Sequence, residues 1–229
     1  MLVPVNDGRL YAEWKLYCEG REKPKTRGYL HFFCAVVLLP VSTSYIIQLA
    51  RENNYARHVA ILYSTTNFLN KSCSALFHLG RWSAKTEILL QKIDHVCCSL
   101  LSAGVMLPMA LLLFPAKIGL VFVALLALGC VWNFWHTAKS NPSVLRQAAI
   151  PATLLLFIYP FCFERMTSFE WTMMSLTFLF QGIGAAVFAK EYPDPCPGYF
   201  GYHEVFHLLE VVSSMFIFLA NCSIVNRMA

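Results

Sequence analysis

The chain has 229 residues, of which 57% are hydrophobic and only 14% charged, with a net charge of +5 and a mean hydropathy of +0.53. Soluble globular domains carry about 25% charged residues, so this composition excludes an ordinary soluble protein and indicates an integral membrane protein. The nine cysteines are scattered without a C-x-x-C pair, which argues against a disulfide framework and a thiolate zinc site. We expect membrane lipids, and no nucleic acid, as partners.

The N-terminal segment 1–27 is polar and contains six Lys and Arg residues together with Tyr11, Trp14 and Tyr17. It shows no cleavable signal peptide. A short helix resting on the membrane surface would bury its aromatic rings in the interface, whereas a solvated tail would account for the charges equally well. We divide the chain into this segment and a membrane domain over 28–229.

Seven apolar runs follow, each long enough for the roughly 20 residues that a helix needs to cross a bilayer. The runs are 29–50, 57–79, 92–114, 117–137, 144–164, 168–189 and 200–224. Pro40, in the first run, predicts a kink in that helix. The sequence therefore predicts an all-α integral membrane protein, a seven-transmembrane helical bundle.

The basic residues predict how this bundle lies in the membrane. The side that holds the N-terminus carries twelve Lys and Arg residues, and the opposite side carries five. Because basic residues concentrate on the cytosolic side, we expect a cytosolic N-terminus. The charges do not choose between the plasma membrane and an endomembrane.

Four polar residues follow one face of the second run at spacings of 4, 3 and 4, namely Asn67, Lys71, Ser74 and His78. Such a stripe on a spanning helix faces the bundle interior or a wet cavity. Hydrogen bonding between helices would account for Asn67 and Ser74 without any site. Lys71 lies about two turns from the end of the run, which favours a role as a counter-charge over snorkelling.

Asp94 lies close to the predicted start of the third run. A residue there is often solvated or caps a helix, but histidines at the same depth on two other runs favour a site role. Three further histidines, His31, His58 and His136, lie at the ends of runs and are most simply interfacial. Only His31 is kept as an additional contact of the site.

The last run carries four polar residues on one stripe of a helix, namely His203, His207, Glu210 and Ser214. Two imidazoles at i and i+4 can both direct a ring nitrogen at one metal ion; the alternative is a pair of buried, hydrogen-bonded histidines. With seven runs, the ends that carry His78, Asp94 and His203 lie on the same side of the membrane. Six or eight runs would separate His203 from His78.

The segments Ser74-Ala-Leu-Phe-His78, Asp94 and His203-Glu-Val-Phe-His207 together resemble the S-x3-H, D and H-x3-H pattern of the progestin and adipoQ receptor family, most closely its hemolysin III branch. The resemblance implies a seven-helix protein with zinc held by His78, His203 and His207 near the cytosolic side. It also implies that Asp94 and Ser74 belong to the site, and it extends to the motifs of alkaline ceramidases. This chain departs from its relatives in the stretch 23–31, which leads into the first run, and at Glu210, where relatives usually have an apolar residue.

Three histidines leave an open coordination position, as in catalytic zinc sites, where the ion activates water. Asp94 can serve as the general base or orient a ligand, and Ser74 can hydrogen-bond the water or an oxyanion. The leading hypothesis is a zinc-dependent hydrolase of lipid amides with a ceramide-like sphingolipid substrate. A signalling receptor, a cytolysin or channel, and a bundle with purely structural zinc remain alternatives.

Overall fold

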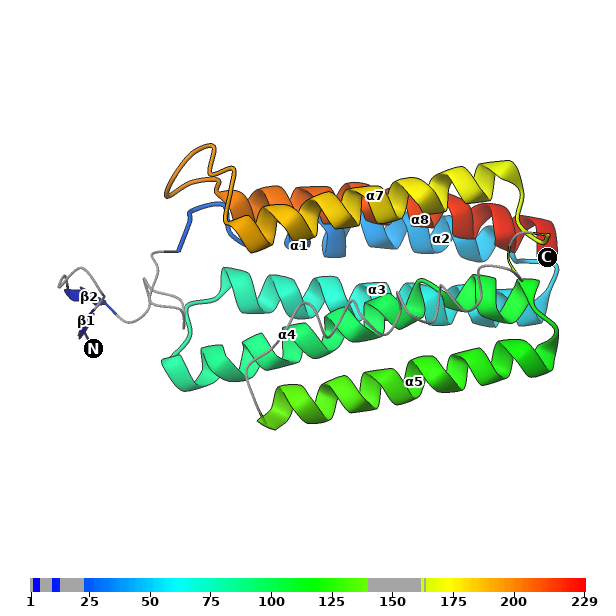
Figure 1. The fold of residues 1–229 in the computed structure, drawn as a ribbon, viewed down its shortest axis with the longest axis horizontal. Helices are drawn as coiled ribbons and strands as arrows, with labels where there is room; N and C mark the ends of the chain where they lie inside the picture. The colour runs from blue at the N-terminus through cyan, green and yellow to red at the C-terminus, as the bar shows by residue number, and fades with distance from the viewer. Residues whose placement is uncertain (1, 5–9, 13–22, 140–161, 163) are drawn as a thin grey trace.

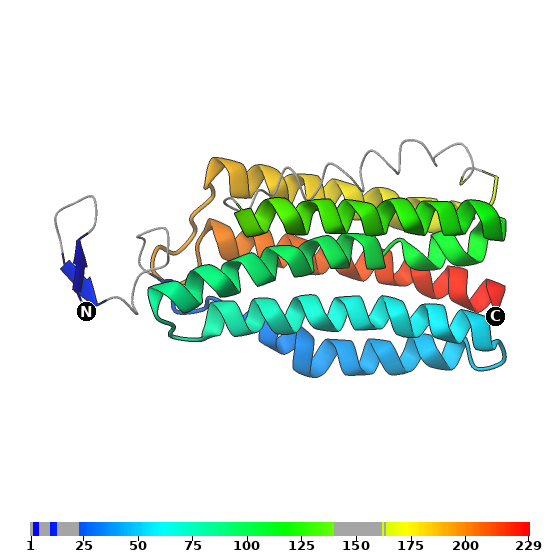
Figure 2. The ribbon, with the colours of Figure 1, turned by 90° about the horizontal axis from the view of Figure 1, so that it is seen from below.

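The computed structural model describes residues 2–4, 10–12, 23–139, 162 and 164–229. Within these ranges the membrane domain consists of long helices that run side by side along one axis (Figures 1 and 2). The predicted helical character of this domain is therefore confirmed. The predicted run 144–164 lies almost entirely outside the described residues.

The described part of the N-terminal segment includes two short strands, and the surface helix that we considered for 1–27 falls largely on residues outside the described ranges. The strands β1 (Leu2–Pro4) and β2 (Leu10–Ala12) pair antiparallel. They lie beyond the end of the bundle, as Figure 1 shows.

The first membrane helix is interrupted near Pro40. It comprises α1 (Tyr29–Phe33), a π-helical turn η2 (Cys34–Leu38) and α2 (Leu39–Leu49). Proline has no N–H to donate to the preceding turn, and π-helical turns are a common place for a helix to absorb such a defect. The irregularity predicted at Pro40 thus appears just before that residue.

The next two helices begin at side-chain caps. The helix α3 (Asn54–Leu79) starts after Asn53, whose side chain accepts hydrogen bonds from the backbone N–H groups of Tyr55 and Ala56. The helix α4 (Ala84–Gly104) starts after Ser83, which accepts from the N–H of Thr86. The helix α4 thus begins well before the predicted boundary at residue 92, and it is followed by the π-helical turn η3 (Met109–Leu113).

Three further long helices complete the described bundle. They are α5 (Ala116–Lys139), α7 (Ser168–Lys190) and α8 (Tyr202–Met228). A capping box between Thr167 and Glu170 fixes the start of α7. The helices α7 and α8 pack against each other, as do α3 and α4.

Five helices of the described ranges are long and apolar enough to cross a membrane, namely Tyr29–Leu49, Ala84–Leu113, Ala116–Lys139, Ser168–Lys190 and Tyr202–Met228. The helix α3 has 26 residues but is less apolar, because it carries the polar stripe. Large apolar side chains such as Val41, Leu128 and Val131 are exposed on the outside of the bundle, where hydrocarbon can solvate them. These features identify a multi-pass integral membrane protein.

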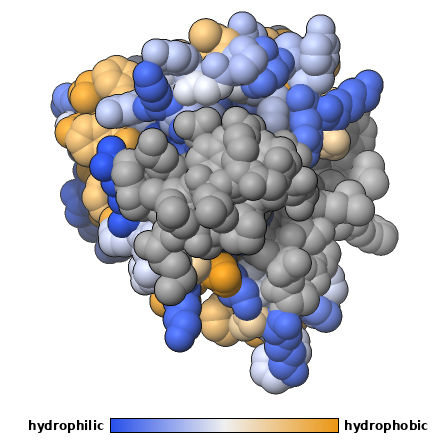
Figure 3. Space-filling view, turned by 90° about the vertical axis from the view of Figure 1, so that its left-hand side faces the viewer, coloured by the Kyte–Doolittle hydropathy of each residue, from blue (hydrophilic) through white to orange (hydrophobic). Residues whose placement is uncertain are grey.

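The two ends of the bundle differ in chemistry. The hydrophobic core, with Ile46, Val59, Met109 and Ile224, lies towards the end that holds the C-terminus. The opposite end, seen end-on in Figure 3, shows hydrophilic residues around its rim. The polar residues considered next lie towards this second end.

Candidate metal centre

Four histidines from three helices converge towards the end of the bundle that bears the N-terminal strands. His31 comes from α1, His78 from the last turn of α3, and His203 and His207 from the start of α8. The ring centroids of His78 and His207 are 5.3 Å apart, and those of His203 and His207 are 4.5 Å apart. The structure therefore brings together all three histidines predicted as ligands.

A metal-binding geometry is clearest for His31, His78 and His207. Each can offer a nitrogen atom such that all three atoms lie within 4.8 Å of one another, and all three residues are buried. His203 is only half-buried and stands beside this group, with its ring 5.2 Å from that of His78. The predicted set and this group share His78 and His207 and differ in the third member.

Several buried polar atoms at this end have no hydrogen-bond partner among the described residues. They include Nδ1 of His31, Nε2 of His207 and Oδ1 of Asp94. Leaving such atoms unsatisfied costs free energy, so their accumulation at one place is typical of a ligand-binding site. Neutral imidazole nitrogens are preferred ligands of zinc and related divalent ions, so these residues fit a metal ion.

Asp94 and Ser74 lie at the interface between α4 and α3. Both side chains are buried, and the Ser74 hydroxyl lies beside the Asp94 carboxyl group. Because α4 begins at Ala84, Asp94 lies well inside the helix rather than at the solvated boundary that the sequence suggested. Ser74 lies one helical turn from His78 on the same helix.

Lys71 and Glu210 form a buried ion pair between α3 and α8. The other carboxylate oxygen of Glu210 lies 3.2 Å from Nδ1 of His207. The same nitrogen lies 2.9 Å from Nε2 of His31. The sequence placed Lys71 and Glu210 on polar stripes but did not pair them, because stripes on two separate helices carry no information about their register.

The segment just before α1 crosses this end of the bundle. Arg27 forms a buried ion pair with Glu204, whose side chain also accepts from the N–H of Gly201 at the start of α8. Gly28 has a φ of +87°, and a Cβ at this position would lie 2.8 Å from Cβ of His78. The chain therefore passes directly over His78 in a conformation that favours glycine.

The remaining contacts of this segment tie it to neighbouring loops. The N–H of Lys25 donates to the carbonyl of Gly198, and Nζ of Lys23 donates to the carbonyl of Gly80 at 2.7 Å. Partial burial lowers the pKa of Lys23 to about 8, with smaller contributions from Arg27 and Arg81, and the Glu87 carboxylate opposes this shift. Sequence reasoning missed these contacts because loop residues follow no helical periodicity.

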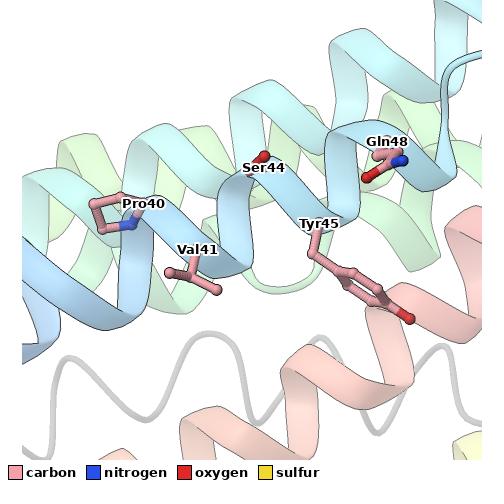
Figure 4. Close-up of a pocket in the computed structure, with 5 residues that line it drawn as sticks. All are labelled: Pro40, Val41, Ser44, Tyr45 and Gln48. Carbon is pink, nitrogen blue, oxygen red and sulfur yellow. The ribbon is translucent and has the colours of Figure 1, made fainter.

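A pocket of about 430 Å³ lies elsewhere, along α2, and is shown in Figure 4. Pro40, Val41, Ser44, Tyr45 and Gln48 line it, so its lining contains neither a histidine nor an acidic group. His58, which was predicted to be interfacial, lies in the first turns of α3, at the end of that helix opposite to His78. Its ring hydrogen-bonds the Asn54 carbonyl. Neither feature adds to the histidine cluster.

A comparison with known protein families agrees with this arrangement. The family model described as haemolysin-III related matches residues 20–218. The match covers the residues just before α1, the described membrane helices with α8 matched as far as residue 218, and all four histidines of the cluster.

Proposed function

The chain belongs to the haemolysin-III-related family, and from this premise we propose that it is a zinc-dependent hydrolase of lipid amides. Its reaction centre is the histidine cluster together with Asp94 and Ser74. One observation carries the proposal: a buried ring nitrogen of His207 and a buried carboxylate oxygen of Asp94, each without a hydrogen-bond partner among the described residues, occur in the half of the bundle that holds the histidine cluster.

The proposed bundle has seven spans and a cytosolic N-terminus. Nζ of Lys92 in α4 donates to the carbonyl of Ala138, so α5 ends at the histidine end. Glu170 pairs with Arg227 at 3.0 Å, so α7 begins at the opposite end, beside the end of α8. The residues between α5 and α7 have to connect these two ends, which supports a further span at 144–164. The excess of basic residues on the histidine side supports its cytosolic orientation.

His78, His203 and His207 are the proposed zinc ligands. The spacing of His203 and His207 places both on one face of α8, and their rings lie close to that of His78. Nε2 of His31 already faces Nδ1 of His207 at hydrogen-bonding distance, so His31 fits the role of a neighbour better than that of a ligand. When bound, zinc supplies Lewis-acid activation of water and of a carbonyl group.

The side chains of α3 and α4 complete the proposed chemistry. Oδ1 of Asp94 accepts a proton from the attacking water, whose oxygen forms the new bond to the acyl carbon. The amide C–N bond breaks, and the proton held by Asp94 passes to the leaving amine. The Ser74 hydroxyl, which lies beside the Asp94 carboxyl group, can donate its single hydrogen to the oxyanion that develops on the acyl oxygen.

The proposed substrate is a membrane lipid with an amide bond, such as a ceramide-like sphingolipid. The site lies at one end of helices whose outer surfaces are apolar, so a lipid can approach it from the bilayer. An amide near the head group of a lipid would reach the depth of the cluster while its chains remain in hydrocarbon. A pore-forming protein would need a continuous polar path, but the apolar core fills the end of the bundle that holds the C-terminus.

The test is turnover of a ceramide-like substrate by zinc-loaded wild-type protein and by the Asp94→Asn variant. Loss of a general base costs about 10²–10⁴-fold in rate, whereas the three histidines still hold the metal. We expect wild-type turnover, and the variant to keep its zinc while losing most activity. Equal rates in the two proteins would eliminate the base role of Asp94.

The second candidate is a signalling receptor in which the metal is structural. The receptor is favoured by the fact that the clustered histidines come from different helices, because a metal bound there would link α3 to α8. If zinc-loaded wild-type protein hydrolyses no lipid amide, this reading replaces the hydrolase.

A further inference from the structure

The Lys71–Glu210 ion pair is an expensive feature for a membrane protein. The side chain of Lys71 is 3% exposed and that of Glu210 is 13% exposed. Burying two charges costs several kcal/mol per ion before their attraction offsets it, and apolar side chains of similar volume often stabilise a protein as well or better. Stabilisation of the packing between α3 and α8 therefore does not by itself explain why this ion pair is present.

The second oxygen of Glu210 points to a different role. It lies 3.2 Å from Nδ1 of His207. A carboxylate can only accept a hydrogen bond, so this contact is favourable when the proton of the imidazole is on Nδ1 and repulsive when Nδ1 carries a lone pair. The unprotonated atom of the ring is then Nε2, the buried nitrogen that has no hydrogen-bond partner.

We propose that Glu210, charge-balanced by Lys71, is a positioning residue that holds the proton of His207 on Nδ1 and thereby presents Nε2 to the metal. This inference rests on the proposed zinc site. It also assigns a role to His31. The Nε2 atom of His31 faces the same Nδ1–H group of His207, so this Nε2 has to act as a hydrogen-bond acceptor. Carboxylates behind ligating imidazoles commonly raise metal affinity by 10–100-fold in this way.

Two double variants separate positioning from stabilisation. Lys71→Met with Glu210→Leu removes both charges and the acceptor, whereas Lys71→Met with Glu210→Gln removes both charges but keeps a side-chain carbonyl that can accept from Nδ1–H. Zinc affinity is measured for each purified protein by competition with a fluorescent chelator. Thermal unfolding of the metal-free proteins shows whether both variants are folded.

We expect the Leu variant to bind zinc about 10–100-fold more weakly than wild type and the Gln variant to stay within a few-fold. In metal-free protein labelled with ¹⁵N-histidine, His207 should be protonated on Nδ1 in wild type and in the Gln variant. In the Leu variant the proton should no longer be confined to Nδ1. A structural role would change unfolding temperatures but would leave this tautomer unaltered.

The inference is overturned if the two double variants bind zinc equally well or equally poorly, or if His207 of the wild type carries its proton on Nε2. Either result would leave the proposed zinc site standing. Wild-type protein that binds no zinc would instead remove the proposed function and this inference together. Should a double variant fail to fold, the wild-type tautomer alone still decides the role of Glu210.

Discussion

At the scale of single residues, two histidines compete for the third position of the proposed metal site beside His78 and His207. His31 has the closer packing, because its ring centroid is 4.1 Å from that of His207. His203 lies one helical turn from His207 on α8. Its ring nitrogens take no part in the contact between His31 and His207. The proposed assignment of His203 as the ligand rests on its i, i+4 spacing to His207 on α8.

This assignment predicts different outcomes for two alanine variants. His203→Ala should lose bound zinc, because two remaining imidazoles hold the ion weakly. His31→Ala should keep close to one zinc per chain, since it removes only an acceptor behind His207. Metal analysis of both purified proteins checks the prediction, and zinc retained in His203→Ala but lost in His31→Ala would reverse the assignment.

At the scale of elements, the segment before α1 holds the end of α3 in place. Gly28→Ala would force a residue with a side chain into the left-handed region and would place its Cβ 2.8 Å from that of His78 and 2.9 Å from the backbone nitrogen of Leu79. Strain and overpacking of this kind cost about 1–3 kcal/mol each. We expect a lower unfolding temperature and weaker zinc binding, because the backbone of His78 has to move.

Gly182→Ala is the matched control. Gly182 lies inside α7, and a Cβ there would meet no atom within 4 Å among the described residues beyond the neighbouring turns of its own helix. Alanine in a helix interior stabilises by roughly 0.5–1 kcal/mol relative to glycine. An unfolding temperature of Gly28→Ala at or above that of wild type would contradict the proposed close packing over His78.

The elements also show what the sequence could and could not predict. The 4-3-4 spacing in α3 correctly indicated a buried stripe, and all four of its residues, Asn67, Lys71, Ser74 and His78, are buried. The start of α4 was placed too late because its first turns contain Lys85, Glu87 and Lys92, which lower the hydropathy of a segment that Ser83 nevertheless caps as a helix.

The contacts between elements were beyond the reach of the sequence. Helical periodicity fixes the face on which a residue lies, but not its depth relative to a residue of another helix. The pairing of Lys71 with Glu210 and of Arg27 with Glu204 therefore required coordinates. The same limit applies to His31, which looked interfacial because it begins an apolar run, yet lies inside the cluster.

At the scale of the whole molecule, the proposed orientation can be tested with the loop before α8. Cys196 is exposed there, at the histidine end, whereas Asn226 lies at the opposite end. In a background without the other cysteines, an impermeant thiol reagent applied outside intact cells should miss Cys196. Under the same conditions, Asn226→Cys in a background without Cys196 should be labelled, as the positive control.

Labelling of Cys196 from outside, with no labelling of Asn226→Cys, would invert the orientation and place the histidine cluster at the outer face. A lipid amide in the outer leaflet would then be the accessible substrate. The family membership and the cluster itself would be unaffected.

The central claim is that the histidine cluster holds zinc, and metal analysis of purified protein tests it most directly. We predict about one zinc per chain in the wild type and none in His207→Ala, because this variant removes the imidazole at the centre of the cluster. The variant should also unfold at a lower temperature, since a metal that binds only the folded state stabilises it. Full zinc occupancy in His207→Ala, or a wild type without zinc, would contradict the claim.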